Sequence, residues 1–375
     1  MIQPIVLSIY MISFKTIILL ILKSLNPNQN LLSFAAQKYM LTLTELKTLL
    51  ATPQRIVITT HHKPDGDAMG SSLGLYGYLI QKGHHVKVIT PTDYPTFLHW
   101  MPNNSDVIIF TEAQEKAAQL VDEASLIFCL DFNTLSRINE LGELVRAAGA
   151  KKIMIDHHLE PEDFDDYRHW DINACAAAQL VYDFIVNQLQ DGELINKDVA
   201  SCLYTGIMTD SGSFRFSSAT AEVYRIAANL IDLGADQSKI HELVYDNSSE
   251  NRLRFLGYCL SNKLEVLRDY NTALISVTKE ELAQYHSITG DTEGVVNYAL
   301  SINGIRLAAL IIERTDKVKL SVRSTGDFPA NEICKKYFNG GGHRNAAGGA
   351  SEKPLADVVN EFKSILAEYK EQLIA

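Results

Sequence analysis

Five runs of mainly apolar residues, rich in valine and isoleucine, alternate with segments of helical periodicity in the first half of the chain. The runs lie at 55–60, 85–90, 106–110, 125–132 and 151–158. Continuous runs of β-branched residues separated by helices are typical of parallel strands that are buried on both faces. The sequence therefore predicts a doubly wound α/β domain, in which helices cover both faces of a mainly parallel sheet.

The character of the chain changes twice after this sheet. Helical periodicity dominates from about residue 176 to residue 265, and strand-like runs then precede a glycine-rich turn and a closing helix. These later runs lie at 271–278, 305–314 and 317–325. Because 375 residues exceed the usual length of one domain, we expect a first domain over 41–250, a helical linker over 251–269 and a smaller α+β domain over 270–375.

The N-terminal segment 5–25 is apolar, but Lys15 interrupts it. A membrane-spanning helix needs about 20 apolar residues, and a signal peptide begins with basic residues, which "MIQPIV" lacks. We interpret residues 1–40 as an extension outside the fold, with Met40 as the start of the globular chain. Membrane association through 5–25 is the alternative.

The amino-acid composition indicates the cellular compartment of the protein and limits the kinds of ligand that it can bind. The net charge of −11 argues against a general basic surface for coating long nucleic acid, so an anionic substrate must be bound by a local basic site. The five cysteines are scattered and show no CxxC spacing, which excludes a zinc ribbon and favours a reducing compartment. We therefore expect a cytoplasmic protein.

Histidines and aspartates follow three of the predicted strands directly, and a further aspartate ends a helical pattern. These residues are His61, His62, Asp65 and Asp67 after the first strand, Asp131 after the fourth, Asp156, His157 and His158 after the fifth, and Asp210. A single aspartate at a strand end is usually a helix cap or a turn former. In open α/β sheets, however, loops converge beyond the carboxyl ends of the strands, so four segments would deliver these side chains to one edge. We therefore favour a metal site.

The donor set limits which metal can bind. Carboxylates and imidazoles without cysteine suit Mn²⁺, Mg²⁺ or Zn²⁺. One catalytic ion must keep coordination positions open for water and substrate, so it cannot use all of these side chains as ligands. Two ions joined by a bridging carboxylate fit the set better. Such a pair provides an activated water for attack on phosphorus and stabilises the developing negative charge. The sequence therefore predicts a phosphoester hydrolase.

Several motifs together resemble the DHH family of phosphoesterases. They are "HHKPDGDAMGS" at 61–71, "LDFN" at 130–133, "DHH" at 156–158 and "GGGHRNAAGG" at 340–349, the last resembling the signature of the DHH-associated C-terminal domain. The full set is specific, whereas the triplet alone would be a weak signal. The resemblance implies a two-metal catalytic domain followed by a substrate-binding domain, with Mn²⁺ as the preferred ion.

The resemblance also implies a role for each matched residue. One ion would be held by His61, Asp65 and Asp131, and the other by Asp67, Asp131, His157 and Asp210. Asp131 would then bridge the two ions. His158 would face the scissile phosphate and donate a hydrogen bond or a proton, while Asp156 orients its neighbours. His62 falls at a variable position, and we interpret it as solvent-facing.

The second domain is expected to bind the substrate. Between residues 305 and 345 there are eight lysines or arginines and four acids, a local positive excess in an acidic chain. By resemblance, Arg323 and Ser324 match an Arg–Ser pair that contacts a substrate phosphate, which a guanidinium can hold through two hydrogen bonds. The remaining candidates for nucleotide contact are Gly340, Gly341, Gly342 and His343. Without the other motifs, the glycine run would be interpreted as a flexible loop.

Within the family, the compact chain is most similar to the bacterial oligoribonucleases that also dephosphorylate 3′-phosphoadenosine 5′-phosphate. We predict hydrolysis of short RNA oligonucleotides and of this adenosine bisphosphate, without binding of long duplex nucleic acid. The resemblance also allows a homodimer. The alternatives are a phosphodiesterase of linear or cyclic dinucleotides (pApA, c-di-AMP) and a catalytically silent nucleotide-binding sensor, which would need no bridging acid.

Overall fold

The computed structural model describes residues 40–375. The segment predicted to be an extension outside the fold, including the apolar run 5–25, lies outside the described residues apart from Met40. Within 40–375, no helix is both long enough and apolar enough to cross a membrane.

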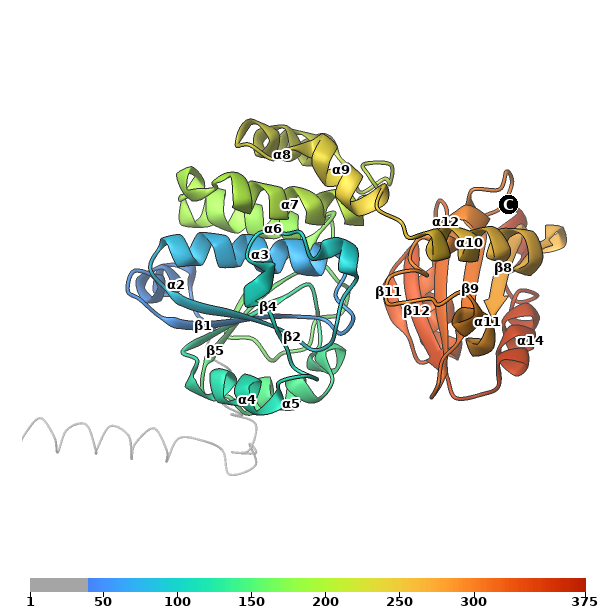
Figure 1. Cartoon of the computed structure of the whole chain (residues 1–375), viewed down its shortest axis with the longest axis horizontal. Helices are drawn as coiled ribbons and strands as arrows, with labels where there is room; N and C mark the ends of the chain where they lie inside the picture. The colour runs from blue at the N-terminus through green and yellow to red at the C-terminus, as the bar shows by residue number, and fades with distance from the viewer. Residues whose placement is uncertain (1–39) are drawn as a thin grey trace, which may run out of the picture. The chain divides into compact units, whose positions relative to one another are not determined.

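The first sheet contains six strands, all parallel (Figure 1). They are β1 (Arg55–Thr60), β2 (His85–Thr90), β3 (Ile108–Ile109), β4 (Leu126–Leu130), β5 (Lys151–Asp156) and β6 (Tyr167–Trp170). The spatial order is β3-β2-β1-β4-β5-β6, so successive strands are added first on one side of β1 and then on the other. The loops after β1 and β4 therefore diverge at a topological switch point, where ligand sites form in open α/β sheets.

Alternate residues of these strands pack into two separate cores, as the period of two in a strand requires. Ile56 and Ile58 of β1 belong to the larger core, whereas Val57 belongs to the smaller one. The face with the larger core is covered by helices α3 (Gly66–Gln81), α6 (Ala177–Asp183) and α7 (Lys197–Asp210), and α2 (Leu43–Leu50) lies at the edge of this face. Two further helices, α8 (Ala221–Asp232) and α9 (Gln237–Tyr245), are stacked beyond α7. Helices α4 (Gln114–Glu123) and α5 (Glu140–Ala147) cover the opposite face (Figure 1). The predicted doubly wound domain is confirmed.

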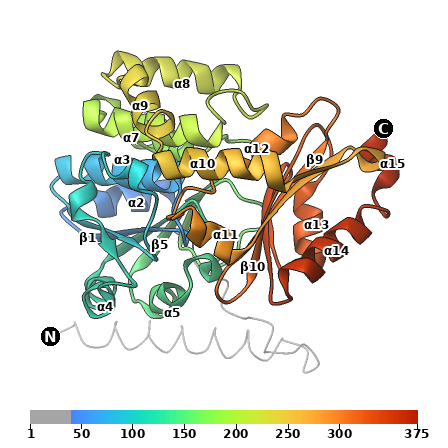
Figure 2. The same cartoon turned by 45° about the vertical axis from the view of Figure 1, so that its right-hand side comes forward.

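The second sheet is mixed and has the order β11-β12-β10-β9-β8-β7. Its strands are β7 (Leu264–Leu267), β8 (Thr272–Val277), β9 (Leu307–Glu313), β10 (Val318–Ser324), β11 (Gly341–His343) and β12 (Ala346–Ser351). Helices α13 (Ala330–Tyr337) and α14 (Leu355–Ile365) pack on one face, and α10 (Glu250–Tyr258), α11 (Lys279–Gln284) and α12 (Val295–Leu300) pack on the other (Figure 2). The short α15 (Lys370–Ile374) ends the chain. The predicted α+β character of this region is confirmed.

Four strands were not expected from the sequence. β6 and β7 are short edge strands with mixed polarity, and the expected glycine-rich turn is the antiparallel hairpin of β11 and β12. β7 lies inside the range predicted as a helical linker and pairs with β8. Edge strands pair on one side only and need no continuous apolar run, which explains why their sequences gave little signal. The exact domain boundaries stay a prediction.

Helices α3 and α7 cross in close contact because glycines lie at the crossing. A Cβ atom at Gly70 would lie 2.6 Å from the carbonyl oxygen of Cys202 and 2.7 Å from the main-chain nitrogen of Gly206. A Cβ atom at Gly206 would in turn lie 2.8 Å from Oδ1 of Asp67. The start of α3, which carries Asp67, and the end of α7, which carries Asp210, are therefore held close together.

We predict that Gly70→Ala destabilises the protein by about 1–3 kcal/mol, because the added methyl group would overlap main-chain atoms that cannot rotate away. The matched control is Gly257→Ala in α10, where a Cβ atom would meet nothing within 4 Å. This control should be neutral, or more stable by up to about 1 kcal/mol, because alanine favours helix. Urea unfolding of both variants tests the prediction, and equal free energies of unfolding would contradict it.

Candidate active site

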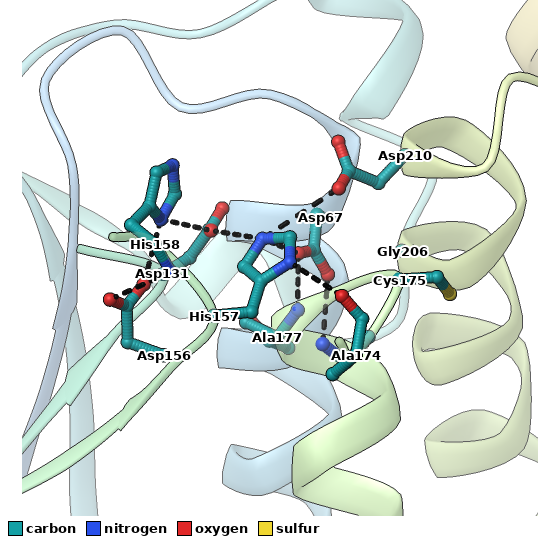
Figure 3. Close-up of polar contacts among 12 residues, drawn as sticks. Asp67, Asp131, Asp156, His157, His158, Ala174, Cys175, Ala177, Gly206 and Asp210 are labelled. Carbon is teal, nitrogen blue, oxygen red and sulfur yellow. Dashed lines mark hydrogen bonds and ion pairs between the residues drawn. The ribbon is translucent and has the colours of Figure 1, made fainter. Parts of the chain in front are cut away.

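Figure 3 shows a cluster of predicted site residues at the carboxyl edge of the first sheet, namely Asp67, Asp131, Asp156, His157, His158 and Asp210. Asp65 caps the start of α3, where its Oδ1 accepts the main-chain N–H groups of Asp67 and Ala68 at 3.0 and 3.1 Å. Asp131 directly follows β4, and Asp210 is the last residue of α7. The neighbouring positions of β1, β4 and β5 in the sheet bring these groups together.

Asp131 lies between two imidazoles. Its Oδ2 is 3.4 Å from Nε2 of His61, and its Oδ1 is 3.4 Å from Nε2 of His157. The carboxylate is 3 % exposed, and the residue has a φ of +62°, a left-handed conformation that is uncommon outside glycine. Each oxygen of Asp131 therefore faces a different group of ligands.

The first group consists of His61, Asp65 and Asp131. Nε2 of His61 lies 3.8 Å from Oδ1 of Asp65, while Nδ1 lies 3.0 Å from the carbonyl oxygen of His62. A carbonyl can only accept, so Nδ1 donates and the lone pair of a neutral imidazole is on Nε2, facing the carboxylates. Burial lowers the pKa of His61, but Asp131 and Asp65 outweigh this and raise it to about 10. In the absence of a metal ion, His61 would therefore carry a proton on Nε2, where the two carboxylates could also hold a metal cation.

The second group consists of Asp67, Asp131, His157 and Asp210. Nε2 of His157 lies 3.8 Å from Oδ2 of Asp67 and 3.7 Å from Oδ2 of Asp210. Nδ1 of His157 lies 3.1 Å from the carbonyl oxygen of Ala174, which selects the same tautomer as in His61. The two groups share Asp131, so they form two adjacent sets of ligand atoms.

The N-terminus of α6 fixes the side chain of Asp67. The main-chain N–H of Ala177 donates to Oδ2 at 2.6 Å, and that of Ala178 donates to Oδ1 at 2.8 Å (Figure 3). Free N–H groups at a helix N-terminus favour a negative charge. Asp67 is thus held in place while each oxygen keeps further acceptor capacity.

The site carries more negative charge than its histidines balance. Burial and the charges of Asp131 and Asp210 raise the pKa of Asp67 well above the usual value. Burial, with the charges of Asp65 and Asp131, also raises the pKa of Asp210 to about 7, although His157 opposes the shift. Burying several carboxylates together is costly unless cations compensate them. The residues present therefore fit divalent cations.

His158 is oriented by Asp156. Oδ1 of Asp156 lies 2.8 Å from Nδ1 of His158, and Oδ2 accepts the main-chain N–H of His158 at 3.1 Å. Asp156 is fully buried. The ring of His343, from β11 of the second sheet, stacks on His158 with the centroids 4.5 Å apart. Burial, followed by the neighbouring histidines, lowers the pKa of His343 to about 2, so this ring is neutral.

The other second-domain candidates differ in their freedom to bind a ligand. Arg323 is half-buried and its charge acts on Asp210, but Ser324 donates its hydroxyl to the carbonyl of Phe328 at 2.6 Å. A Cβ atom at Gly340 would overlap the carbonyl oxygen of Gly348, and one at Gly342 would lie 2.7 Å from the carbonyl oxygen of Ala346; at Gly341 it would meet nothing within 4 Å. Two of the three glycines are thus needed for the hairpin itself, and Gly341 is open.

Sequence reasoning missed Arg137, and it misjudged the environment of His62. The positive charge of Arg137 contributes to the lowered pKa values of His158 and His343, which places its side chain near that pair. A lone arginine six residues after Asp131 gave no signal of this role. His62 is half-buried rather than solvent-facing, and its main-chain N–H donates to the carbonyl of Arg137 at 2.8 Å.

Comparisons with known proteins agree with this geometry. A family model described as the DHH family, N-terminal domain, matches residues 55–207, and one described as the DHHA1 domain matches residues 277–373. The bifunctional oligoribonuclease and PAP phosphatase NrnA of Thermus thermophilus is 32% identical over 327 residues, which is 87% of this chain and 93% of that protein. The fold and the acid–histidine site define a phosphoesterase. The chain belongs to the DHH family.

Two solved structures show the same architecture. An exopolyphosphatase-related protein from Bacteroides fragilis is 42% identical with a TM-score of 0.84, covering 89% of this chain and 97% of that protein. RecJ of Thermus thermophilus in complex with Mn²⁺ has a TM-score of 0.50 at 12% identity, covering 88% of this chain and 55% of RecJ. The second likeness shows the fold alone.

We predict that MnCl₂ raises the unfolding temperature of the protein, because an ion that binds only the folded state at 100 times its dissociation constant stabilises it by about 2.7 kcal/mol. Asp131→Asn should abolish most of this increase. Asparagine has nearly the same shape and tolerates positive φ, so the substitution removes mainly the charge. The control is Asp232→Asn on the exposed end of α8. An undiminished Mn²⁺ effect in Asp131→Asn would contradict the assignment of this residue.

Proposed function

We propose that this chain is a Mn²⁺-dependent hydrolase that releases mononucleotides from short RNA oligonucleotides and removes a phosphate from 3′-phosphoadenosine 5′-phosphate. The observation that carries the proposal is the carboxylate of Asp131, which joins two groups of ligand atoms within reach of His158. The substrates are proposed from the name of the relative in Thermus thermophilus. A cytoplasmic location and a homodimer stay predictions.

The two groups of ligands would each hold one divalent ion. His61, Asp65 and Asp131 would hold the first, and Asp67, Asp131, His157 and Asp210 would hold the second. Two such ions, when bound, provide an activated water and positive charge next to the reacting phosphate. The hydrogen bonds from Ala177 and Ala178 to Asp67, and from the ring nitrogens of the two histidines to carbonyls, keep the ligand atoms oriented in advance.

His158 would transfer the proton that the leaving oxygen needs. Asp156 accepts the Nδ1–H, so Nε2 is the nitrogen left to face the substrate. Burial lowers the pKa of His158, whereas a phosphate oxyanion beside Nε2 favours the protonated ring. The ring would therefore take up its proton when the substrate binds and donate it from Nε2 as the phosphorus–oxygen bond breaks.

The substrate panel that tests the function contains a dinucleotide, a pentanucleotide, 3′-phosphoadenosine 5′-phosphate, pApA and pyrophosphate, each incubated with the full chain and MnCl₂. We expect hydrolysis of at least the dinucleotide and the adenosine bisphosphate. Asp131→Asn should lower both rates by about 10³-fold, because it weakens charge stabilisation of the transition state, while Asp232→Asn should leave them unchanged. Rapid pyrophosphate cleavage with no nucleotide hydrolysis would refute the proposal, and nucleotide binding without turnover would favour the sensor.

Arg323 is proposed to bind a second phosphate of the substrate. Its side chain is half-buried, and burial lowers its pKa. Its Nη1 donates to the main-chain carbonyls of Val322 at 3.1 Å and Ala347 at 3.5 Å. Among the residues that the structure describes, Nε and Nη2 have no hydrogen-bond partner and can bind an anion. Asp210 lies close enough to raise the pKa of the guanidinium against the effect of burial. Arg323 would thus position the substrate relative to the metal ligands.

We predict that Arg323→Lys raises the KM for 3′-phosphoadenosine 5′-phosphate by about 10- to 100-fold, because lysine cannot form a bidentate pair with phosphate. The turnover number should change much less. Arg225→Lys on the exposed face of α8 is the control. Steady-state kinetics separates the two parameters, and an unchanged KM would remove Arg323 from the substrate site.

A further inference from the structure

Strand β10 carries two basic residues on one face of the second sheet. Side chains alternate between the two faces of a strand, so Lys319, Ser321 and Arg323 share one face. The residues between them pack in the core on the other face. Lys319 and Arg323 are both half-buried, and at about 3.3 Å per residue they lie about 13 Å apart along the strand.

The face that carries these basic residues reaches the stacked histidines. Arg323 is directly opposite Ala346 of β12, and Ala346 is directly opposite His343 of β11. Opposed residues of antiparallel strands point to the same face, and neighbouring strands are about 4.8 Å apart. His343 therefore shares the face of Arg323, and its ring lies 4.5 Å from the ring of His158. The face thus extends from the candidate active site along β10 to Lys319.

Small residues leave space beside the basic residues. The β12 residues opposite Lys319, Ser321 and Arg323 are Ala350, Gly348 and Ala346, respectively. Helices α10, α11 and α12 cover the same face over β8 and β9, but in the described part of the chain their core includes no residue of β10 or β12. An extended ligand can therefore lie along β10 and β12 without meeting a bulky side chain.

Lys319 has no acid that compensates its charge. Among the residues that the structure describes, its amino group forms no ion pair or hydrogen bond. Burial lowers the pKa of Lys319, and the charges of Lys317 and Arg314 lower it further. The opposing carboxylate of Asp316 already pairs with Nζ of Lys317 at 3.4 Å. An unpaired cation that is partly removed from water is stabilised by an anionic ligand.

A loop of the first domain lies within electrostatic reach of the same lysine. Burial and the charge of Lys319 lower the pKa of His62 to about 4. The charge of Lys63 contributes in turn to the lowered pKa of Lys319. Both loop residues directly follow the metal-ligand candidate His61. Positive charge therefore gathers beside the metal site as well as along β10.

We propose that Lys319 binds a backbone phosphate of an oligoribonucleotide that extends past Arg323 along β10, away from the metal ligands. The separation of about 13 Å exceeds one step between neighbouring phosphates of a strand. A dinucleotide or an adenosine bisphosphate therefore has no phosphate that reaches Lys319. This inference rests on the proposed function and deepens it, because it assigns the preference for longer oligonucleotides to one residue.

The test compares kcat/KM for a pentanucleotide and a dinucleotide in the wild type, Lys319→Gln and Lys319→Arg. Lys319→Gln should lower the ratio of the pentanucleotide value to the dinucleotide value by about 3- to 10-fold, through a higher KM for the pentanucleotide. Lys319→Arg keeps the charge and should retain the ratio. Lys116→Gln, on the exposed face of α4, removes the same charge elsewhere and should also retain it.

Salt dependence distinguishes a phosphate contact from a packing role of the lysine side chain. Each phosphate of a single strand that is neutralised contributes about 0.7 to the slope of log affinity against log salt concentration. Lys319→Gln should therefore reduce this slope for the pentanucleotide by about 0.7. A ratio that Lys319→Gln leaves unchanged, or a lower ratio with an unchanged slope, overturns the assignment.

Equilibrium binding separates this inference from the proposed function. Fluorescence anisotropy of a labelled pentanucleotide gives its Kd for Asp131→Asn, in which hydrolysis is expected to be slow, with and without Lys319→Gln. If the wild type hydrolyses no nucleotide but Lys319→Gln weakens binding about 3- to 10-fold with the smaller salt slope, the function fails and the phosphate contact stands. Equal Kd values overturn the contact, whether or not the wild type hydrolyses RNA.

Discussion

The carboxylate of Asp131 is the contact on which the site depends, because it is the only group shared by both sets of ligand atoms in the described part of the chain. Its place between His61 and His157 follows from the topology: β4 pairs with β1 on one side and with β5 on the other. A residue at the end of β4 therefore lies between the loops that end β1 and β5. The positive φ of Asp131 turns the chain at that point, and the surrounding contacts must offset this strain.

Helix packing positions the remaining ligands. The glycine contacts between α3 and α7 bring Asp67 and Asp210 to within 3.8 and 3.7 Å of Nε2 of His157, and the start of α6 donates two N–H groups to Asp67. Three helices that are separate in the sequence thus control one cluster of acids. A substitution at Gly70 would act on the metal ligands through this packing, because the interior is close-packed and transmits such shifts. A Cβ atom at Gly206 would contact a ligand directly, because it would lie 2.8 Å from Oδ1 of Asp67.

Sequence reasoning was strongest where one local cause determines the structure. Strands 55–60 and 85–90 match the predicted ranges because most of their residues are buried and β-branched, and helix 197–210 ends at Asp210 as its pattern indicates. It was weakest where strand pairing, or a specific side-chain contact, determines the structure. The edge strand β6 has mixed polarity, the hydroxyl of Ser324 donates to the carbonyl of Phe328, and the charge of Arg137 acts on His343 of the second sheet. None of these contacts leaves a periodic pattern in the chain.

The stacked histidines divide the reacting centre between two separately encoded sheets. A polypeptide that ended before β7 would contain every carboxylate around Asp131 and would still lack the imidazole of His343. A polypeptide that began at β7 would contain that imidazole without a partner ring. Gene fusion or duplication of either half alone would therefore yield an incomplete centre, and the two halves must be inherited together for the centre to form.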